Sequence, residues 1–370
     1  MAGIALLLLG LRSPVPVALL ALLLPVAVAF LLLPADIGNF TAWRSALAYV
    51  SLFAIASATL LLARGGDPLS DRLLAGAVYV WFAVGMLQMF IGRTLLTGLV
   101  SEARTTADRG VTALATEPSH YATVAAFLLL LLFLRGRERS PAGLLCVVQI
   151  VLLAQSAQVA FLLAFAVVVY GLAMARPVVF LAGLLAPLAV LAAWSLEVTL
   201  RTDGLRILEL LSLLIDNPAL LVVADPSGNQ RLAAIFFAFK GFLDHGFLPG
   251  SLADFGAYMG AQLDSGAWPL FFADPTERIL SGYGAALYEL GMFGLAVPLV
   301  AGFGLFRYFR GSVRHAVVAS ALLHPLMLTA VPLALPLVGL TIGMCYGPRR
   351  YRGRDETDLA DDQNASTVVQ

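Results

Sequence analysis

Apolar stretches long enough to enter a membrane dominate this sequence, and short breaks containing Arg, Pro or Gly separate them. A helix of about 20 apolar residues crosses the hydrocarbon core of a bilayer. Ten stretches approach this length, at about residues 14–33, 45–63, 73–91, 120–134, 143–155, 157–174, 177–195, 284–306, 315–329 and 331–346. The sequence therefore predicts an all-α, polytopic transmembrane helix bundle of about 10 to 11 spans. The short runs 143–155 and 157–174 can also be read as one bent element.

The composition agrees with a membrane protein and excludes several other classes. Of the 370 residues, 60% are hydrophobic and 12% are charged, which is too apolar for a soluble domain. The formal net charge is zero, so we expect no nucleic-acid partner. Cys146 and Cys345 lie inside apolar stretches, where free thiols are expected. No metal-ligand spacing and no nucleotide-binding motif is found, so no metal and no cofactor is predicted.

The two ends of the chain differ in character. The first 34 residues could pass for a signal peptide, but the apolar run at 14–33 is longer than a typical signal core and further spans follow. We interpret it as an uncleaved first span. Residues 2–11 form either an eleventh, short span or an interfacial helix. Residues 349–370 are polar and are predicted to be a disordered cytoplasmic tail, which leaves 1–348 as the transmembrane domain.

Basic residues occupy alternate breaks between the apolar runs, beginning with Arg12, Arg64 and Arg72, and continuing at residues 135–139, 176, 307–314 and 349–354. Cytoplasmic loops collect Arg and Lys, so this alternation predicts that both termini are cytoplasmic. The long breaks 92–119 and 196–283 then face outward as extracytoplasmic loops. Within the second loop, residues 202–216 have the spacing of an amphipathic interfacial helix, and residues 230–246 are apolar enough to dip into the bilayer.

Arginine in the outer breaks suggests a site for phosphate. The planar guanidinium group bonds two oxygens at once and keeps its charge, which suits it to this ligand. The alternative is that these side chains reach lipid headgroups or pair with neighbouring acids. Arg231 stands out because it leads an otherwise apolar segment. The candidate cations are Arg93, Arg109, Arg201, Arg206, Arg231, Lys240 and Arg278.

Three groups of residues could take part in acid–base chemistry. Glu117, Pro118, Ser119 and His120 precede an apolar run, where they either start a helix or face a site at its mouth. Glu289 lies inside a predicted span, and a charge at that depth indicates a functional role or a buried partner. His245 follows an apolar segment and is either a proton acceptor near neutral pH or a solvated side chain.

Four segments, in this order, resemble the O-antigen polymerase and O-antigen ligase superfamily. They are RGVTALATEPSHYA at 109–122, LLAQSAQVAFLLAF at 152–165, RLAAIFFAFKGFLDHGFLPG at 231–250 and SGYGAALYELGMFGL at 281–295. The motif residues that carry the resemblance are Pro118, Ser119, Gly246, Pro249, Gly250, Gly291 and Gly294. The chain lacks the His-Asn pair of the ligases before residue 284. It also has Ser156-Ala157-Gln158 in place of the family's Ser-Arg, and these departures favour a polymerase.

The resemblance implies a metal-independent inverting glycosyltransferase in the bacterial inner membrane. It would polymerise polyprenyl-diphosphate-linked repeat units into a surface polysaccharide at the outer face, with membrane lipids, a flippase and a chain-length regulator as further partners. Arg109 and Arg231 would neutralise the diphosphate, assisted by Arg93, Arg206 and Lys240. Glu117, His245 and Glu289 are the candidate catalytic residues. The alternatives are ligase-type transfer, a transporter or flippase without catalysis, and a non-catalytic scaffold.

Overall fold

A computed structural model describes residues 16–65, 70–100, 110–175, 226–272, 274–329 and 331–348. Throughout these ranges the regular structure is helical, and no strand occurs in them. The all-helical prediction is confirmed to this extent. The predicted span 177–195, the amphipathic helix at 202–216, residues 2–11 and the tail 349–370 lie outside the described residues.

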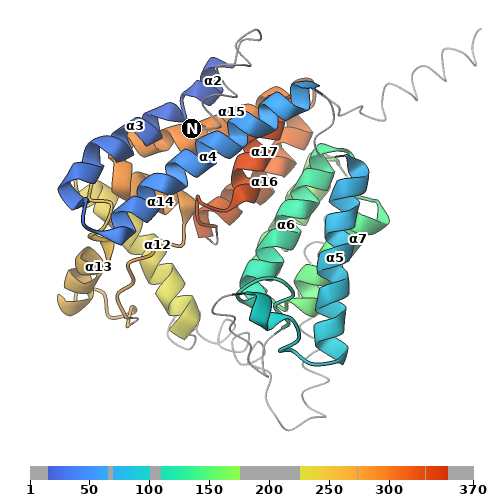
Figure 1. The fold of residues 1–370 in the computed structure, drawn as a ribbon, viewed down its shortest axis with the longest axis horizontal. Helices are drawn as coiled ribbons and strands as arrows, with labels where there is room; N and C mark the ends of the chain where they lie inside the picture. The colour runs from blue at the N-terminus through green and yellow to red at the C-terminus, as the bar shows by residue number, and fades with distance from the viewer. Residues whose placement is uncertain are drawn as a thin grey trace, which may run out of the picture.

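The first half of the chain forms a series of helices (Figure 1). The elements are α2 (Val17–Leu20), α3 (Leu23–Leu32), the 3₁₀ turn η1 (Leu33–Asp36), α4 (Phe40–Gly65), α5 (Asp71–Phe90), η2 (Thr97–Leu99), α6 (Pro118–Leu134), α7 (Pro141–Val148), the π-helical turn η3 (Gln149–Leu153) and α8 (Ala157–Ala173). The runs 143–155 and 157–174 thus form separate helices, which meet at residues 154–156.

The second half carries the helices that complete the bundle. They are α12 (Pro226–Asp244), α13 (Phe255–Asp264), α14 (Gly282–Leu290), η4 (Gly291–Leu295), α15 (Ala296–Tyr308), α16 (Val313–Thr329) and α17 (Pro336–Tyr346). Four helical segments are long and apolar enough to cross a membrane, at Val17–Asp36, Phe40–Arg64, Asp71–Phe90 and Gly282–Tyr308. Five further apolar helices in the described ranges are shorter than this length. The fold is therefore that of a helical membrane protein, and the number of 10 to 11 spans stays a prediction.

One of the predicted spans, 284–306, is broken. Helix α14 ends at Leu290, and Gly291 adopts a φ of +58° and a ψ of −139°, a conformation that only glycine reaches without strain. A Cβ atom at Gly291 would overlap the carbonyl oxygen of Phe247, and one at Gly294 would overlap that of Ala286. The chain therefore turns through η4 before α15 begins, within the stretch 284–306 that the sequence predicts as one span.

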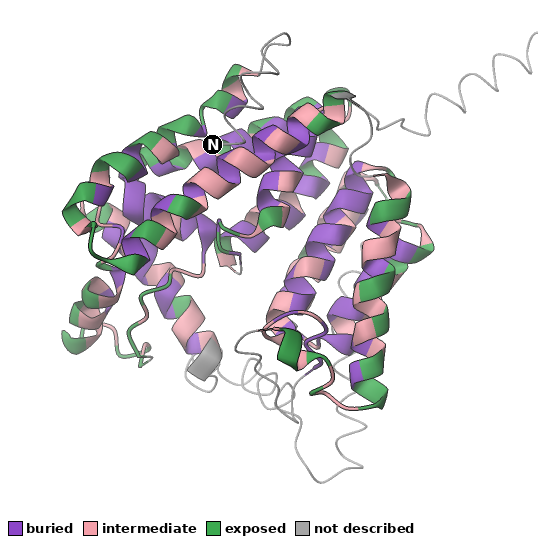
Figure 2. Ribbon diagram, viewed as in Figure 1, coloured by how far each residue is buried: buried purple, intermediate pink, exposed green. Residues whose placement is uncertain are grey.

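Helix α6 lies inside the bundle. It contacts α5, α7, α8, α16 and α17, and almost every residue from Ala122 to Leu134 is buried (Figure 2). Large apolar side chains on the outer helices point away from the core, among them Leu31, Phe90 and Leu172, which are 79%, 76% and 63% exposed. Apolar side chains on both faces of a helix are expected where one face packs and the other meets lipid.

The basic breaks meet at one end of the bundle. Asp71 at the start of α5 forms ion pairs with Arg135 and Arg137, both at 2.9 Å, beyond the end of α6. At the same end the hydroxyl group of Tyr308 donates to the carbonyl oxygen of Leu134, and Arg139 donates to Tyr170 near the end of α8. This gathering agrees with the alternation of basic breaks in the sequence. Their location in the cytoplasm stays a prediction.

Candidate functional site

The site begins at the first turn of α6. Glu117 precedes the helix as its N-cap residue and Pro118 occupies the first helical position, so the predicted helix start is confirmed. The Glu117 carboxylate, however, accepts no hydrogen bond from the N–H groups of this turn. It accepts instead from the hydroxyl group of Ser119 and from Arg231. The acid at this helix start is therefore directed toward another helix.

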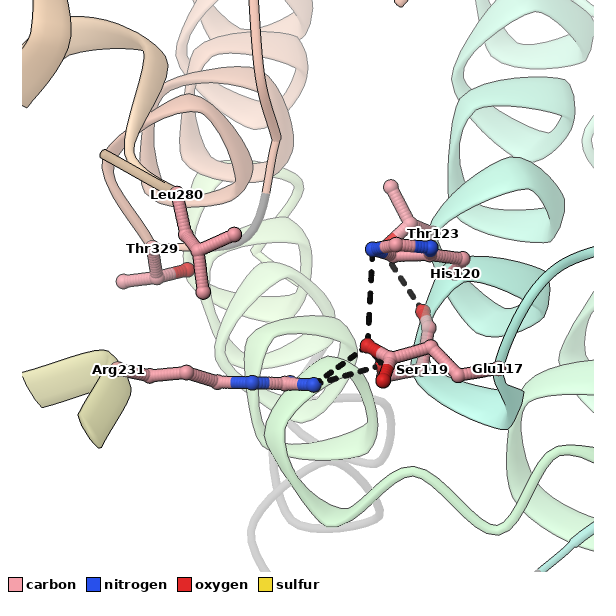
Figure 3. Close-up of a pocket in the computed structure, with 7 residues that line it drawn as sticks. All are labelled: Glu117, Ser119, His120, Thr123, Arg231, Leu280 and Thr329. Atoms are coloured by element: carbon pink, nitrogen blue, oxygen red, sulfur yellow. Dashed lines mark hydrogen bonds and ion pairs between the residues drawn. The ribbon is translucent and has the colours of Figure 1, made fainter. Parts of the chain in front are cut away.

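Arg231 reaches this turn from the beginning of α12, as Figure 3 shows. Its Nη2 atom lies 2.6 Å from Oε1 of Glu117 and 2.9 Å from Oγ of Ser119. The side chains of Arg231 and Glu117 are 20% and 18% exposed, respectively. Because solvent screens a pair of this burial less than an exposed one, the ion pair joins α12 and α6 more strongly than a typical surface salt bridge would.

Gln158 holds the other side of the guanidinium group. Its Oε1 atom accepts from Nη1 of Arg231 at 3.0 Å, and its Nε2 atom donates to the carbonyl oxygen of Thr329 at 3.0 Å. The amide thereby links the first turn of α8 to the end of α16. It fixes the direction of Arg231 without cancelling its charge.

His120 completes the polar wall on α6. Its Nδ1 atom lies 2.7 Å from Oγ1 of Thr116, and its Nε2 atom lies 3.5 Å from Oε1 of Glu117. Thr123, one turn further along, donates to the carbonyl oxygen of Ser119 at 2.9 Å. Sequence reasoning noted His120 as part of a helix start but did not select it as a site residue.

A pocket separates α6 from α12 at this place. Its cavity volume is about 20 Å³, and it is partly open to solvent. Figure 3 shows Arg231 entering from one side and the first turn of α6 facing it from the other. The lining residues are Glu117, Ser119, His120, Thr123, Arg231, Leu280 and Thr329. A group small enough to enter would meet a cation, a carboxylate, a hydroxyl group and an imidazole.

The predicted cations do not all converge here. Among those in the described ranges, Arg231 lines the pocket, whereas Arg93 follows the end of α5 and does not. Lys240 forms an ion pair with Asp244 and lies nine residues after Arg231, which is about 13 Å along the helix. Arg109 and Arg206 are outside the described residues. Of the candidate cations in the described ranges, Arg231 alone lines the pocket, and Arg93, Lys240 and Arg278 do not.

Glu289 lies apart from the pocket, in a contact between α14 and α4. Its carboxylate accepts from the hydroxyl group of Tyr49 at 2.6 Å and from Ser45 at 3.0 Å, and the residue is 8% exposed. The sequence left two interpretations of Glu289 open, a functional role or a buried partner. Among the described residues, Ser45 and Tyr49 are its buried hydrogen-bond partners.

His245 also lies away from the pocket. Its ring packs beside Tyr258 and Tyr288, with centroids 5.8 and 5.3 Å away, and its buried Nδ1 atom has no hydrogen-bond partner among the described residues. The chain turns at Gly246, where φ is +63°, and Pro249 and Gly250 follow. The backbone N–H of Gly250 donates to the carbonyl oxygen of Tyr288 at 3.2 Å, so this Pro/Gly loop is fixed against α14.

Beside this loop, Asp244 accepts hydrogen bonds from Lys240 and Tyr258, the latter at 2.6 Å. These two donors lower the pKa of the Asp244 carboxyl group below its ordinary value. The charge of Lys240 is thus balanced within its own helix.

Arg44 directly precedes the predicted span 45–63 and was not among the candidate cations, but in the structure it lies inside α4. It lies on α4 between Thr41, which donates to Glu277 at 3.1 Å, and Ser45, which donates to Glu289. Residues spaced by three and four share one face of a helix, so these polar residues at the start of an apolar run were a usable signal.

The fold and this pocket define a helical membrane protein with a charged site at the end of the bundle away from its basic breaks. No model of a known protein family matches the chain, and no curated protein matches it either. Its function must therefore be argued from the chemistry of the site.

Proposed function

We propose that this protein polymerises polyprenyl-diphosphate-linked oligosaccharide repeat units into a surface polysaccharide at the outer face of the bacterial inner membrane. The observation that supports this most is the ion pair between Arg231 and Glu117 at the mouth of a pocket. These residues come from two of the four segments that resemble O-antigen polymerases. The resemblance and the pocket chemistry thus point to the same place in the molecule.

The position of the pocket suits a lipid-linked substrate. It opens at the start of α6, whereas the Asp71 ion pairs lie beyond the other end of this 17-residue helix, about 25 Å away. If the basic end is cytoplasmic, as the sequence predicts, the pocket lies on the outer side. There a diphosphate at headgroup level would face Arg231, and the glycan would extend into water.

The reaction requires one bond to form and one to break. A hydroxyl oxygen of the acceptor sugar attacks the anomeric carbon of the donor sugar from the face opposite the diphosphate. The bond between that carbon and the phosphate oxygen breaks, and its electron pair leaves with the lipid diphosphate. Arg231 stabilises the negative charge of this leaving group, and Glu117 accepts the proton of the attacking hydroxyl.

Transport is the second candidate function, and one observation favours it. The helical segment 282–308 is interrupted at Gly291, and discontinuous helices are common at the substrate sites of transporters. On this alternative the protein would move lipid-linked sugars without joining them. The interruption at Gly291 lies beside Phe247, in the loop that follows α12, and not at the Arg231 pocket. We therefore rank polymerisation first.

A reconstituted assay separates these functions. The full-length protein, in nanodiscs, is given purified lipid-diphosphate repeat units, and the products are the free lipid diphosphate and glycans of increasing length. We expect wild-type protein to form both and Arg231→Ala to form neither. Arg137→Ala removes an arginine at the opposite end of the bundle and should behave like wild type. Absence of any polymer with wild-type protein, together with movement of repeat units across liposomes, would establish transport instead.

A further inference from the structure

Three possible hydrogen-bond donors surround a single oxygen atom in the pocket. Oε1 of Glu117 lies 2.6 Å from Nη2 of Arg231, accepts from the Ser119 hydroxyl group, and lies 3.5 Å from Nε2 of His120. These groups come from two helices that are far apart in the sequence, and they converge on a position that borders open space. Such convergence of donors on one oxygen is the arrangement that binds an anion.

The start of α6 adds to this arrangement. An N-cap acid usually accepts from the free N–H groups of its own helix, but Glu117 does not. The N–H groups of the first turn of this 17-residue helix therefore form no hydrogen bond with the Glu117 side chain, and the helix start carries a partial positive charge. Arg231, Ser119 and the helix start all favour negative charge at the same point.

We propose that Oε1 of Glu117 occupies the subsite of a phosphate oxygen, and that a diphosphate group binds by displacing Glu117 from Arg231. Ser119 and His120 then become ligands of the phosphate, in addition to Arg231. The assignment of a diphosphate rests on the proposed function. The anion subsite itself rests on the contacts around Oε1.

Charge balance explains how one pocket accommodates both states. Without ligand, Glu117 neutralises Arg231, so the partly buried guanidinium group keeps a counter-charge. When a phosphate takes this place, Gln158 continues to hold Nη1 of Arg231, and the cation stays in position for the ligand. Glu117 consequently competes with the ligand, and removing its charge should raise the affinity of the pocket for anions.

The same contacts have a second explanation with the opposite consequence. If the ion pair serves only to fasten α12 to α6, Glu117→Gln loosens the pocket, and anion binding stays equal or weakens. The direction in which Glu117→Gln changes the affinity for anions therefore distinguishes a competing carboxylate from a purely structural ion pair.

Inorganic pyrophosphate is the probe, and its binding to full-length protein in nanodiscs is measured by calorimetry at constant ionic strength. We expect Glu117→Gln to lower the Kd about tenfold, because the internal competitor is lost. Arg231→Ala should abolish binding. Asp244→Asn removes a carboxylate from the same helix as Arg231 but away from the pocket, and it should leave the Kd unchanged.

A pyrophosphate Kd of Glu117→Gln that equals or exceeds that of the wild type overturns the proposal. An equal decrease of the Kd in Asp244→Asn also overturns it. Ser119→Ala provides a second measurement that retains Glu117. It should raise the Kd several-fold if Ser119 binds the phosphate, and an unchanged Kd counts against the subsite.

The polymerisation assay keeps the two proposals distinct. Tighter pyrophosphate binding by Glu117→Gln with no polymer from wild-type protein would leave the subsite standing and remove the proposed function. Polymer from wild-type protein without the change in affinity would do the reverse.

Discussion

Arg231 and Glu117 are 114 residues apart in the sequence, and their side chains meet at 2.6 Å between α12 and the start of α6. No other ion pair between described side chains joins these two helices. The contact matters for stability as well as for ligand binding, because it closes one side of the pocket.

We expect the two residues to be energetically coupled. In a double-mutant cycle with Glu117→Gln and Arg231→Met, the coupling free energy should be about 1–2 kcal/mol, since both side chains are mostly buried. Thermal unfolding in detergent measures it. The Lys240–Asp244 pair, one turn apart on α12 and more exposed, is the matched control and should give about 0.3–0.5 kcal/mol. Equal couplings for the two pairs would contradict the expectation.

Gly291 should tolerate no side chain. In Gly291→Ala, an alanine would adopt a φ of +58° and a ψ of −139°, and its Cβ would overlap the Phe247 carbonyl oxygen. We therefore expect the free energy of unfolding to fall by about 3 kcal/mol. Gly38→Ala is the control, because a Cβ there meets nothing within 4 Å. Unfolding temperatures of both variants provide the comparison. Similar temperatures would show that the break at Gly291 is not needed for the fold.

Helices α4 and α17 approach closely at Gly343. A Cβ atom at this position would overlap the carbonyl oxygen of Ala56. Gly343→Ala should therefore force the helices apart and lower the free energy of unfolding by about 2 kcal/mol. Gly76→Ala, on α5, adds the same methyl group where nothing lies within 4 Å. It should be neutral or slightly stabilising, because alanine favours a helix. A loss in Gly76→Ala equal to that in Gly343→Ala would argue against the close approach as the cause.

The pH dependence of stability should include a contribution from Asp244. Hydrogen bonds from Lys240 and Tyr258 lower its pKa in the folded protein, so the ionised form stabilises the fold. This contribution is complete above the unfolded pKa of about 3.9 and is lost as the pH falls through the lower, folded value. Asp244→Asn should therefore show a smaller decrease in unfolding temperature below pH ~4 than wild type. An equal decrease in unfolding temperature for Asp244→Asn and wild type below pH ~4 would contradict this expectation.

The apolar pattern predicted helices well because a run of apolar residues restricts the chain to few structures in lipid. It located α4, α5 and α6 within a few residues, and Pro118 marked the start of α6. It could not show that the run 284–306 is broken, because the reason for the break lies in the contact of Gly291 with Phe247, a residue of another segment.

The site was predictable in part. Arg231 and the Glu117 segment were selected from local context, the one as a cation leading an apolar run and the other as an acid at a helix start. Their pairing depends on how α12 packs against the bundle, which no local pattern encodes. The same limit applies to Glu289, whose partners Ser45 and Tyr49 are more than 200 residues away in the sequence.

The enclosure of α6 also determines which part of the molecule is able to adjust around a ligand. Because α6 contacts five neighbouring helices along its length, a movement of the whole helix would disturb its packing against all of them. Helix α12 packs mainly against α13, α14 and α16, and Leu232, next to Arg231, is 45% exposed. Any rearrangement that admits a larger substrate should thus occur on the side of α12, with the mouth of α6 acting as the stationary wall.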